Sequence, residues 1–260
     1  MVPLVRRVLS WFGEVARRAS TVCDCLAVST LRLADLKKDI ERRWRGAASE
    51  ADIAVGLMPW EEAIIRRFVS DGARVLLVGC GSGRDLLVLA ARGYVVTGVD
   101  PAVEALNTAR HRLAERELSA TLIAGFFEDV PISGPFDAVI FSSFTYGYIP
   151  ESRRRVEALR KAGALLAPGA HIVLSYFANR PPHRGLIAVA RTMGAVTRSD
   201  WRFEPGDLVD MVDRGGRWIC RYAHAFSAGE IAEEAAAAGL RVVAQSEPPD
   251  EAPYAVVALP

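Results

Sequence analysis

The sequence predicts an α/β protein built on a mostly parallel sheet with helices on both faces. Between residues 74 and 177, short apolar runs alternate with segments of helical periodicity. Strands that alternate with helices pair in parallel, because each helix returns the chain to the same edge of the sheet. The first apolar run, residues 75–78, leads directly into three glycines at alternate positions. A strand, a glycine-rich turn and a helix in this order are typical of a ligand-binding edge of such a sheet.

The composition disfavours some classes of function and indicates where the protein is located. Of the 260 residues, 51% are hydrophobic and 24% charged, which is typical of a packed globular protein. The net charge of +1 provides no overall field to attract nucleic acid. The four cysteines have neither zinc-site nor disulfide-framework spacing, so we expect no metal. No apolar run is long enough for a spanning helix and no signal-peptide pattern is present, so we expect a cytoplasmic protein.

Residues 1–72 are expected to form a helical extension or lid. Its first segment has one apolar face at helical spacing, made of Val5, Val8, Leu9, Phe12, Val15, Ala16 and Ala19. The other face is charged and carries Arg6, Arg7, Glu14, Arg17 and Arg18. The favoured interpretation is a helix packed on the body or over the active site, and the alternative is a basic amphipathic helix on a membrane surface. Further helices are expected at about 30–46 and 59–70, with a linker at 46–49.

The elements of the sheet follow in order. Strands are predicted at 74–78, 94–99, 119–124, 136–142 and 170–177, with helices at 83–92, 101–117 and 151–166. A helix at 228–238 and strands at 240–246 and 253–259 complete the pattern. Residues 178–226 are too long for a simple connection and follow a strand, so we expect an inserted region on the substrate side. Alternation at residues 217–222 indicates a strand or hairpin there.

The glycine spacing indicates which kind of nucleotide the turn accepts. Dinucleotide-binding loops read G-x-G-x-x-G, whereas here the glycines are Gly79, Gly81 and Gly83, followed by Arg84. This spacing suits a ligand without a diphosphate. Asp100 ends the second predicted strand, where its carboxylate can accept both ribose hydroxyls of an adenosine.

Residues 74–177 resemble the class I S-adenosylmethionine (SAM)-dependent methyltransferases. The resemblance rests on four segments in the order typical of the family, namely residues 77–83, 96–100, 136–143 and 166–174. It implies a Rossmann-like fold with a seven-stranded sheet whose last strand is antiparallel. It also implies a SAM-binding domain over residues 73–260, with SAM as the cofactor.

The resemblance assigns residues to the cofactor site by position. These residues are Gly79, Cys80, Gly81, Gly83, Asp100, Pro101, Phe126, Phe127 and Ser142. Many members of the family carry an acid near the methionine amine where this chain has Leu77, so the amine needs another acceptor, such as the carbonyl of Gly79. Many also carry an acid that contacts adenine where this chain has Phe126. We expect Phe126 and Phe127 to form apolar walls around the adenine, with the alternatives that one of them belongs to the core or that Glu128 or Asp129 contacts the ring.

Methyl transfer from SAM is a direct displacement, so the enzyme mainly aligns the acceptor with the carbon–sulfur bond. A base is needed only if the acceptor must lose a proton. The candidate catalytic residues are Tyr146, in the loop after the fourth strand, and His183 and His224, in the inserted region. Tyr146 either orients the acceptor or lines its pocket.

The sequence therefore predicts a SAM-dependent methyltransferase that acts on an oxygen, nitrogen or sulfur atom of a small-molecule acceptor. The first alternative is an RNA or protein methyltransferase, which would require residues 180–221 to form one basic face, although the net charge disfavours nucleic acid as a partner. The second is a SAM-binding regulatory protein without catalysis, prompted by Leu77 and Phe126. The acceptor and the oligomeric state are not indicated.

Overall fold

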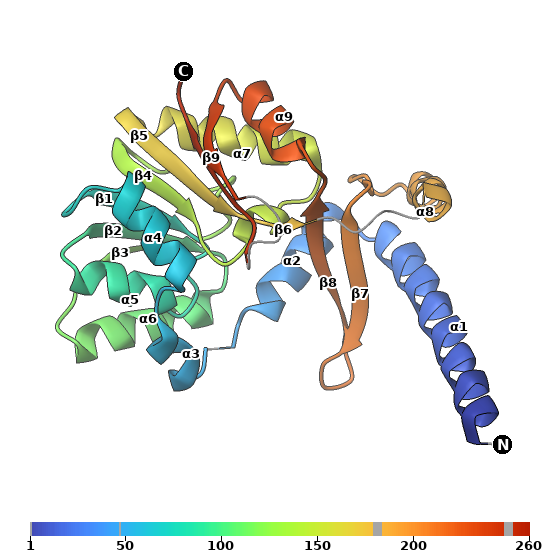
Figure 1. Ribbon diagram of the computed structural model, residues 1–260. Helices are drawn as coiled ribbons and strands as arrows, with labels where there is room; N and C mark the ends of the chain where they lie inside the picture. The colour runs from blue at the N-terminus through green and yellow to red at the C-terminus, as the bar shows by residue number, and fades with distance from the viewer. Residues whose placement is uncertain (1, 47, 179–183, 247–251) are drawn as a thin grey trace. The chain divides into compact units, whose positions relative to one another are not determined.

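The computed structural model describes residues 2–46, 48–178, 184–246 and 252–260, and the chain divides into two compact units (Figure 1). The sheet unit comprises residues 41–180 and 224–260, and the helix–hairpin unit comprises residues 1–40 and 181–223. The division therefore falls near residue 40 instead of residue 72, because residues 41–72 cluster with the sheet.

The sheet unit contains the predicted seven-stranded sheet. Its strand order is β3-β2-β1-β4-β5-β10-β9, and β10 runs antiparallel to both of its neighbours. The remaining pairs between β3 and β5 are parallel, which confirms the expected fold class. The strands are β1 (Arg74–Val78), β2 (Val95–Asp100), β3 (Thr121–Ala124), β4 (Phe136–Phe141), β5 (Leu166–Ser175), β9 (Arg241–Gln245) and β10 (Tyr254–Ala258).

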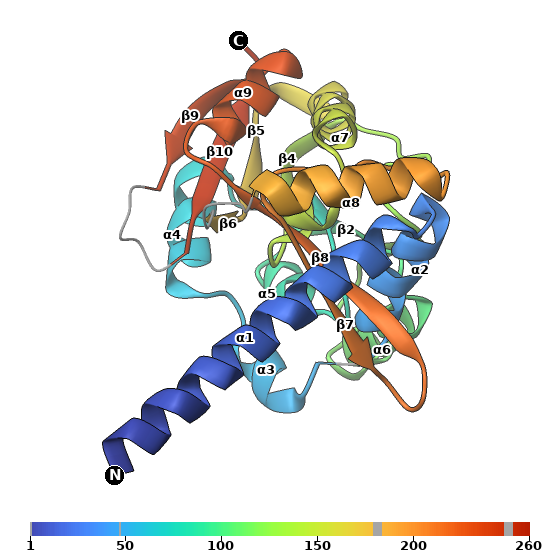
Figure 2. The same ribbon diagram turned by 90° about the vertical axis from the view of Figure 1, so that its right-hand side faces the viewer.

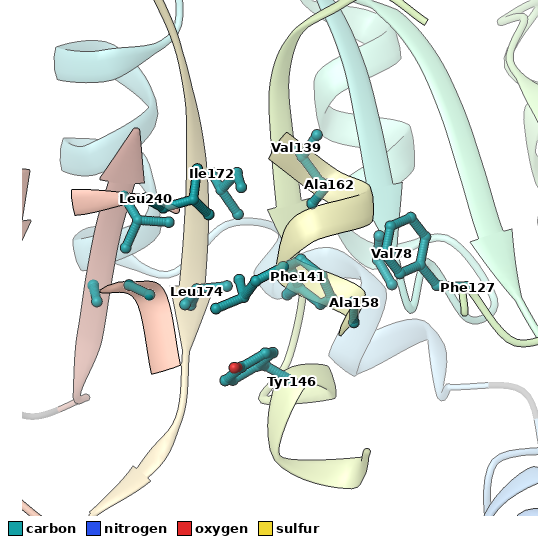
Figure 3. Close-up of a cluster of buried hydrophobic side chains, with 14 of the residues drawn as sticks. Val78, Phe127, Val139, Phe141, Tyr146, Ala158, Ala162, Ile172, Leu174 and Leu240 are labelled. Carbon is teal, nitrogen blue, oxygen red and sulfur yellow. The ribbon is translucent and has the colours of Figure 1, made fainter. Parts of the chain in front are cut away.

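The sheet buries an apolar layer on each face. Along β1, Leu76 and Val78 face one core cluster while Val75 and Leu77 face the other, as the two-residue period of a strand requires. The first cluster includes side chains from α7 (Ser152–Ala164) and α9 (Glu230–Ala237), as Figure 3 shows in part. Helices α4 (Pro59–Phe68), α5 (Arg84–Ala91) and α6 (Val103–Glu115) contribute to the second.

Strand β5 begins four residues earlier than its pattern indicated. We expected Pro168 and Gly169 to separate a helix from a strand starting at residue 170, but both lie within β5. The pairing with β4 shifts there, from Phe136 opposite Leu166 to Ala138 opposite His171. The Pro–Gly pair is thus accommodated as a bulge, where a missing amide donor and a left-handed glycine are tolerated.

Three short elements complete the sheet unit. Helix α3 (Glu50–Val55) lies next to the expected linker and begins with a capping box, in which Ser49 and Asp52 exchange hydrogen bonds. A 3₁₀ helix, η1 (Thr145–Tyr148), follows β4, and β6 (Phe177–Ala178) follows β5. Strand β6 pairs with the end of β8, Phe177 opposite Ala225.

The helix–hairpin unit contains α1 (Val2–Ser29), most of α2 (Leu33–Arg43), α8 (Arg184–Val196), β7 (Asp207–Asp213) and most of β8 (Trp218–Phe226). Helix α1 packs against α8 and β7 (Figure 2). The expected strand near residues 217–222 is β8. Of the helices described, none is both long and apolar enough to cross a membrane.

Candidate functional site

The loop between β1 and α5 has the backbone shape that its glycines predicted. Gly79, Gly81 and Gly83 have φ angles of +78°, +49° and +106°. Residues with a Cβ rarely adopt such left-handed conformations, so the alternating glycines form the turn at low conformational cost. The amide of Gly79 donates to the carbonyl of Val99 at 2.8 Å, and that of Gly83 donates to Cys80 at 3.0 Å. The loop is therefore anchored to β2 and closed on itself.

Asp100 joins the glycine loop to the segment that follows β2. Its Oδ2 accepts the amide hydrogen of Gly81 at 2.9 Å, and its Oδ1 accepts that of Ala102 at 2.9 Å. The side chain is only 6% exposed. Burial raises the pKa of the Asp100 carboxyl above its ordinary value, while the two amide hydrogen bonds oppose that rise. The sequence placed Asp100 at this edge, and the structure shows that it also holds the loop in position.

A second layer of acidic residues lies beside the loop, and sequence reasoning missed it. Asp85, at the start of α5, accepts a hydrogen bond from the hydroxyl of Ser142 at the end of β4. Arg84 donates to Asp85 at 2.5 Å and to Glu61 of α4 at 2.6 Å. Burial and the neighbouring Asp85 raise the pKa of Glu61. This cluster contains two carboxylates and one guanidinium, so it carries a net negative charge when both carboxyls are ionised.

The acidic cluster lines a small pocket of about 20 Å³, room for roughly one water molecule. Glu61, Asp85, Ser142 and Ser175 supply its polar groups, and the rest of the lining is largely apolar. Trp60 lies at the same pocket and stacks on Tyr254 with a centroid distance of 6.1 Å. Only the position of Asp85, two residues after the last glycine of the loop, was available as a signal in the sequence.

The loop after β4 lies directly against the glycine loop. A Cβ at Gly79 would overlap the hydroxyl of Thr145, so no larger residue fits there without movement. Ser143 and Phe144 both have positive φ angles, +48° and +64°. Consecutive left-handed residues other than glycine mark a strained turn of the kind often found at functional sites.

Three further residues assigned to the cofactor site have different surroundings. Cys80 is buried, and burial, with a contribution from Asp100, raises the pKa of its thiol well above the ordinary value. Pro101 is half-buried and precedes α6, which begins two residues later. Phe127 is 3% exposed and packs edge-on against Phe141 at 5.5 Å.

The placement of Phe127 favours the alternative that one of the two phenylalanines belongs to the core (Figure 3). Phe126 is half-buried at the carboxyl end of β3. Its role as an adenine wall stays a prediction.

Tyr146 and His224 are brought together, but inside the protein. Both are 0% exposed. The hydroxyl of Tyr146 donates to Glu234 at 2.5 Å, and Nε2 of His224 lies 2.7 Å from Glu230. Burial and the Glu234 carboxylate raise the pKa of Tyr146 well above its ordinary value, so the phenol stays protonated. Tyr146 faces inward because η1 turns it onto Phe226, with which it stacks at 5.4 Å.

Arg155 of α7 connects this buried pair of residues. It is fully buried, and its guanidinium lies 2.8 Å from Glu234, 3.4 Å from Glu230 and 3.3 Å from His224. The network connects η1, α7, α9 and β8, which indicates a structural role. Neither Tyr146 nor His224 is presented to a ligand in this structure. The remaining candidate, His183, lies outside the described residues.

Comparison with known proteins places this geometry in context. Residues 75–169 match the family described as "Methyltransferase domain". The ubiquinone biosynthesis O-methyltransferase of Psychrobacter cryohalolentis is 30% identical over 184 residues, which cover 68% of this chain and 63% of that protein. The cypemycin N-terminal methyltransferase of a Streptomyces species is 31% identical over 99 residues, or 38% of this chain and 40% of that protein. The chain thus spans less than two thirds of the length of these two relatives.

Solved structures show the same fold. The CcbJ methyltransferase from Streptomyces caelestis superposes with a TM-score of 0.58 at 16% identity, covering 86% of this chain and 96% of that one. The SAM-bound amino pentose methyltransferase CalS10 from Micromonospora echinaspora gives 0.54 at 23% identity, covering 85% and 95%. At these identities the comparison concerns the fold alone.

Proposed function

We propose that this chain, a member of the class I SAM-dependent methyltransferases, transfers the methyl group of SAM to an oxygen, nitrogen or sulfur atom of a small-molecule acceptor. The observation that carries the proposal is the glycine loop, with three left-handed glycines held by Asp100. A loop without side chains allows close approach of a ligand, and the loop precedes the free amides of a helix N-terminus.

Asp100 is the proposed ligand of the adenosine ribose. Each of its carboxylate oxygens already accepts one backbone amide hydrogen. Each oxygen also has a second lone pair, so the carboxylate can accept ribose hydroxyls without releasing the loop. In this proposal Gly79, Gly81 and Gly83 provide the backbone surface under the ligand.

Asp85 and Glu61 are proposed to take the place of the acid that is missing at Leu77. SAM carries a positively charged sulfonium and an ammonium group, and carboxylates in a water-poor site attract such charges strongly. Asp85 is 5% exposed and Glu61 is 8% exposed, so solvent screens them little. Arg84 neutralises part of this charge and keeps the two carboxylates together.

The chemistry needs alignment more than proton transfer. When bound, SAM supplies an electrophilic methyl group, and the acceptor displaces its sulfur with an electron pair. Tyr146 and His224 are buried in this structure, so of the candidate bases His183 is the one we retain as a prediction. The role of residues 178–226 in binding the acceptor is likewise part of this proposal.

The small-molecule class of acceptor is supported by the relatives. They include O-methyltransferases of ubiquinone biosynthesis. A cytoplasmic location is part of the same proposal. Cys23, Cys25, Cys80 and Cys220 form no disulfide bonds, as is usual in a reducing compartment.

Isothermal titration of the purified chain with SAM, S-adenosylhomocysteine and NAD tests the cofactor assignment. We expect the first two to bind in the micromolar range and NAD not to bind. Transfer of a labelled methyl group to a panel of phenols, amines and thiols then tests catalysis. Binding of SAM without turnover on any acceptor class would favour a regulatory protein, and binding of NAD alone would overturn the assignment of the loop.

A further inference from the structure

The first two thirds of α1 present an apolar face that the rest of the helix–hairpin unit leaves uncovered. Leu9, Trp11, Phe12 and Val15 are 65%, 61%, 58% and 44% exposed, and Val22 is 42% exposed. Leu9, Phe12 and Val15 are three residues apart, Trp11 is four residues before Val15 and Val22 is seven residues after it, so the five side chains fall within an arc of about 160° on the helix. Side chains of this size are seldom gathered in water without a partner surface.

The packing of α1 within its own unit involves the C-terminal part of the helix. The helix contacts α8 and β7, and near its C-terminal end it buries Cys25 and Val28. An α-helix turns by about 100° per residue, so Val28 points about 160° away from Phe12, whereas Cys25 and Ser29 point within about 40° of Trp11. Cys25 and Val28 are buried, whereas the described residues between Arg6 and Val22 are exposed apart from the half-buried Gly13.

A helix that is exposed on all sides gains little from its own hydrogen bonds. Isolated helices of fewer than about 15 residues are marginal in water, and longer ones need packing of an apolar face to be well formed. In Figure 2 the N-terminal part of α1 extends past α8 and the β7–β8 hairpin of the same unit. The stability of this part should therefore come from a partner surface.

The charge of α1 identifies the kind of surface. Residues 2–22 contain four arginines and one glutamate. Arg6, Arg7 and Arg18 are exposed; helical spacing places Arg6 on the side away from the apolar face, and Arg7 and Arg18 along its edge next to Trp11. A cationic polar face opposite a face with Trp and Phe is the pattern of helices that lie in the interface of an anionic membrane. A second copy of α1 would bring the same arginines together, so charge complementarity favours lipid.

We propose that α1 lies flat on an anionic lipid surface. Leu9, Trp11, Phe12 and Val15 enter the boundary between headgroups and acyl chains, and the arginines contact lipid phosphates. The chain is then a peripheral membrane protein. The lipid contact itself does not depend on the proposed methyl transfer.

Flotation with vesicles tests the proposal on the full chain. Vesicles of phosphatidylcholine and phosphatidylglycerol in equal parts are expected to carry the protein, and vesicles of phosphatidylcholine alone are expected to carry at least fivefold less. Added salt should release the protein in part, because it screens the arginines. No flotation with either vesicle would overturn the proposal.

Variants on α1 with matched controls locate the contact. The double substitution Trp11→Ala/Phe12→Ala should weaken partition by about tenfold or more, because two large apolar side chains no longer enter the lipid. Arg6→Glu/Arg7→Glu should weaken it by about fivefold or more for each charge, and only on anionic vesicles. Trp218→Ala and Arg217→Glu are the controls, since both side chains are exposed in the same unit but outside α1, and partition should not change.

Two more measurements distinguish the loss of a lipid contact from misfolding and from the pairing of two copies. SAM affinity of each α1 variant should equal that of the unchanged chain, which shows that the variants fold. Analytical ultracentrifugation without lipid tests pairing of two copies. A dimer that dissociates on Trp11→Ala/Phe12→Ala, together with absence of vesicle binding, would assign this face to self-association and overturn the lipid proposal. Equal loss of partition in the Trp218→Ala control would also count against α1 as the contact.

Discussion

At the scale of a single residue, Asp100 is expected to contribute directly to SAM binding. Replacing it by Asn keeps the size of the side chain but removes its charge and turns one acceptor oxygen into a donor. Hydrogen bonds to charged groups contribute about 1.5–3 kcal/mol, so Asp100→Asn should weaken SAM binding by roughly tenfold to a hundredfold. Isothermal titration measures this, with Asp137→Asn as the control because Asp137 pairs with Arg74 and lies outside the glycine loop. Unchanged affinity would remove Asp100 from the site.

Gly79 is needed for two reasons that can be separated. Its φ of +78° strains any residue with a Cβ, and the Cβ would also overlap Thr145. Gly93 has a similar φ of +84° but open space around it, so Gly93→Ala reports the backbone strain alone. We expect Gly93→Ala to cost about 1 kcal/mol and Gly79→Ala about 1–3 kcal/mol more, with loss of SAM binding only in the latter. If urea unfolding shows the same loss of stability for Gly79→Ala and Gly93→Ala, Thr145 can move away from the new Cβ at no cost.

Single residues were predictable where a local pattern determines their place. The glycines and Asp100 follow strand ends, so their position at the edge of the sheet could be read from the sequence. Phe127 and Tyr146 follow strand ends too, but their inward orientation depends on packing partners that come later in the chain. Phe127 packs against Phe141, and Tyr146 stacks on Phe226. Asp85 and Glu61 were missed for the same reason, since Arg84 brings them together only in the folded chain.

At the scale of elements, Arg155 links α7 to α9 through Glu234 and Glu230. Removing one member of a buried charged network leaves the others unpaired, which costs about 3–5 kcal/mol. We expect Arg155→Met to lower the free energy of unfolding by that amount, as measured by urea denaturation. Arg153→Met, two residues earlier on the same helix but 62% exposed, is the control and should change it by less than about 1 kcal/mol. A similar small effect of both would show that the network is not rigidly held.

Glu230 makes the stability of α9 depend on pH. Burial alone would raise its pKa, but hydrogen bonds from His224 and Ser227 lower it from 4.5 to about 2. A carboxyl with a lowered folded-state pKa stabilises the fold above its unfolded pKa, and this stabilisation is lost as the pH falls from about 5 toward 2. Allowing for solvent screening of a half-buried group, the loss is on the order of 1–2 kcal/mol. Urea unfolding at several pH values should show it for the unchanged chain and for Glu233→Gln, an exposed neighbour, but not for Glu230→Gln.

Elements with one strong period were predicted within a few residues, and the exceptions have physical causes. Helix α8 was missed because its segment is apolar and contains Gly185 and Gly194, which weaken a helical signal. Gly194 has a packing reason, since a Cβ there would lie 3.0 Å from the carbonyl oxygen of Ser29 in α1. The close approach of α1 and α8 thus requires a glycine at position 194, although glycine lowers the helix propensity of the local sequence.

At the scale of the whole molecule, a mostly parallel seven-stranded sheet was predictable, because strand–helix alternation indicates parallel pairing and the family resemblance implies seven strands with the last one antiparallel. The division into two units was not, because residues 1–40 and 181–223 join across a long stretch of sequence. No local period reports such a pairing. A contact such as the one from the amide of Cys220 to the carboxylate of Asp39, at 3.0 Å, is visible only after folding.

The division predicts how a bound cofactor distributes its stabilisation. The proposed SAM ligands, including Asp85, Asp100 and Ser142, all belong to the sheet unit. At a SAM concentration about 100 times its Kd, linkage adds about 2.7 kcal/mol to the unfolding of whatever part binds it. Hydrogen exchange should therefore slow by about a hundredfold for the most protected amides of β1, β2 and β4, and change little in α8 and β7.

Two controls accompany this measurement. NAD should change hydrogen exchange in neither unit, and Asp100→Asn should reduce the effect of SAM. Equal slowing in both units would show instead that the two units unfold together. In that case every amide exchanges through the same global unfolding, and SAM slows all of them equally.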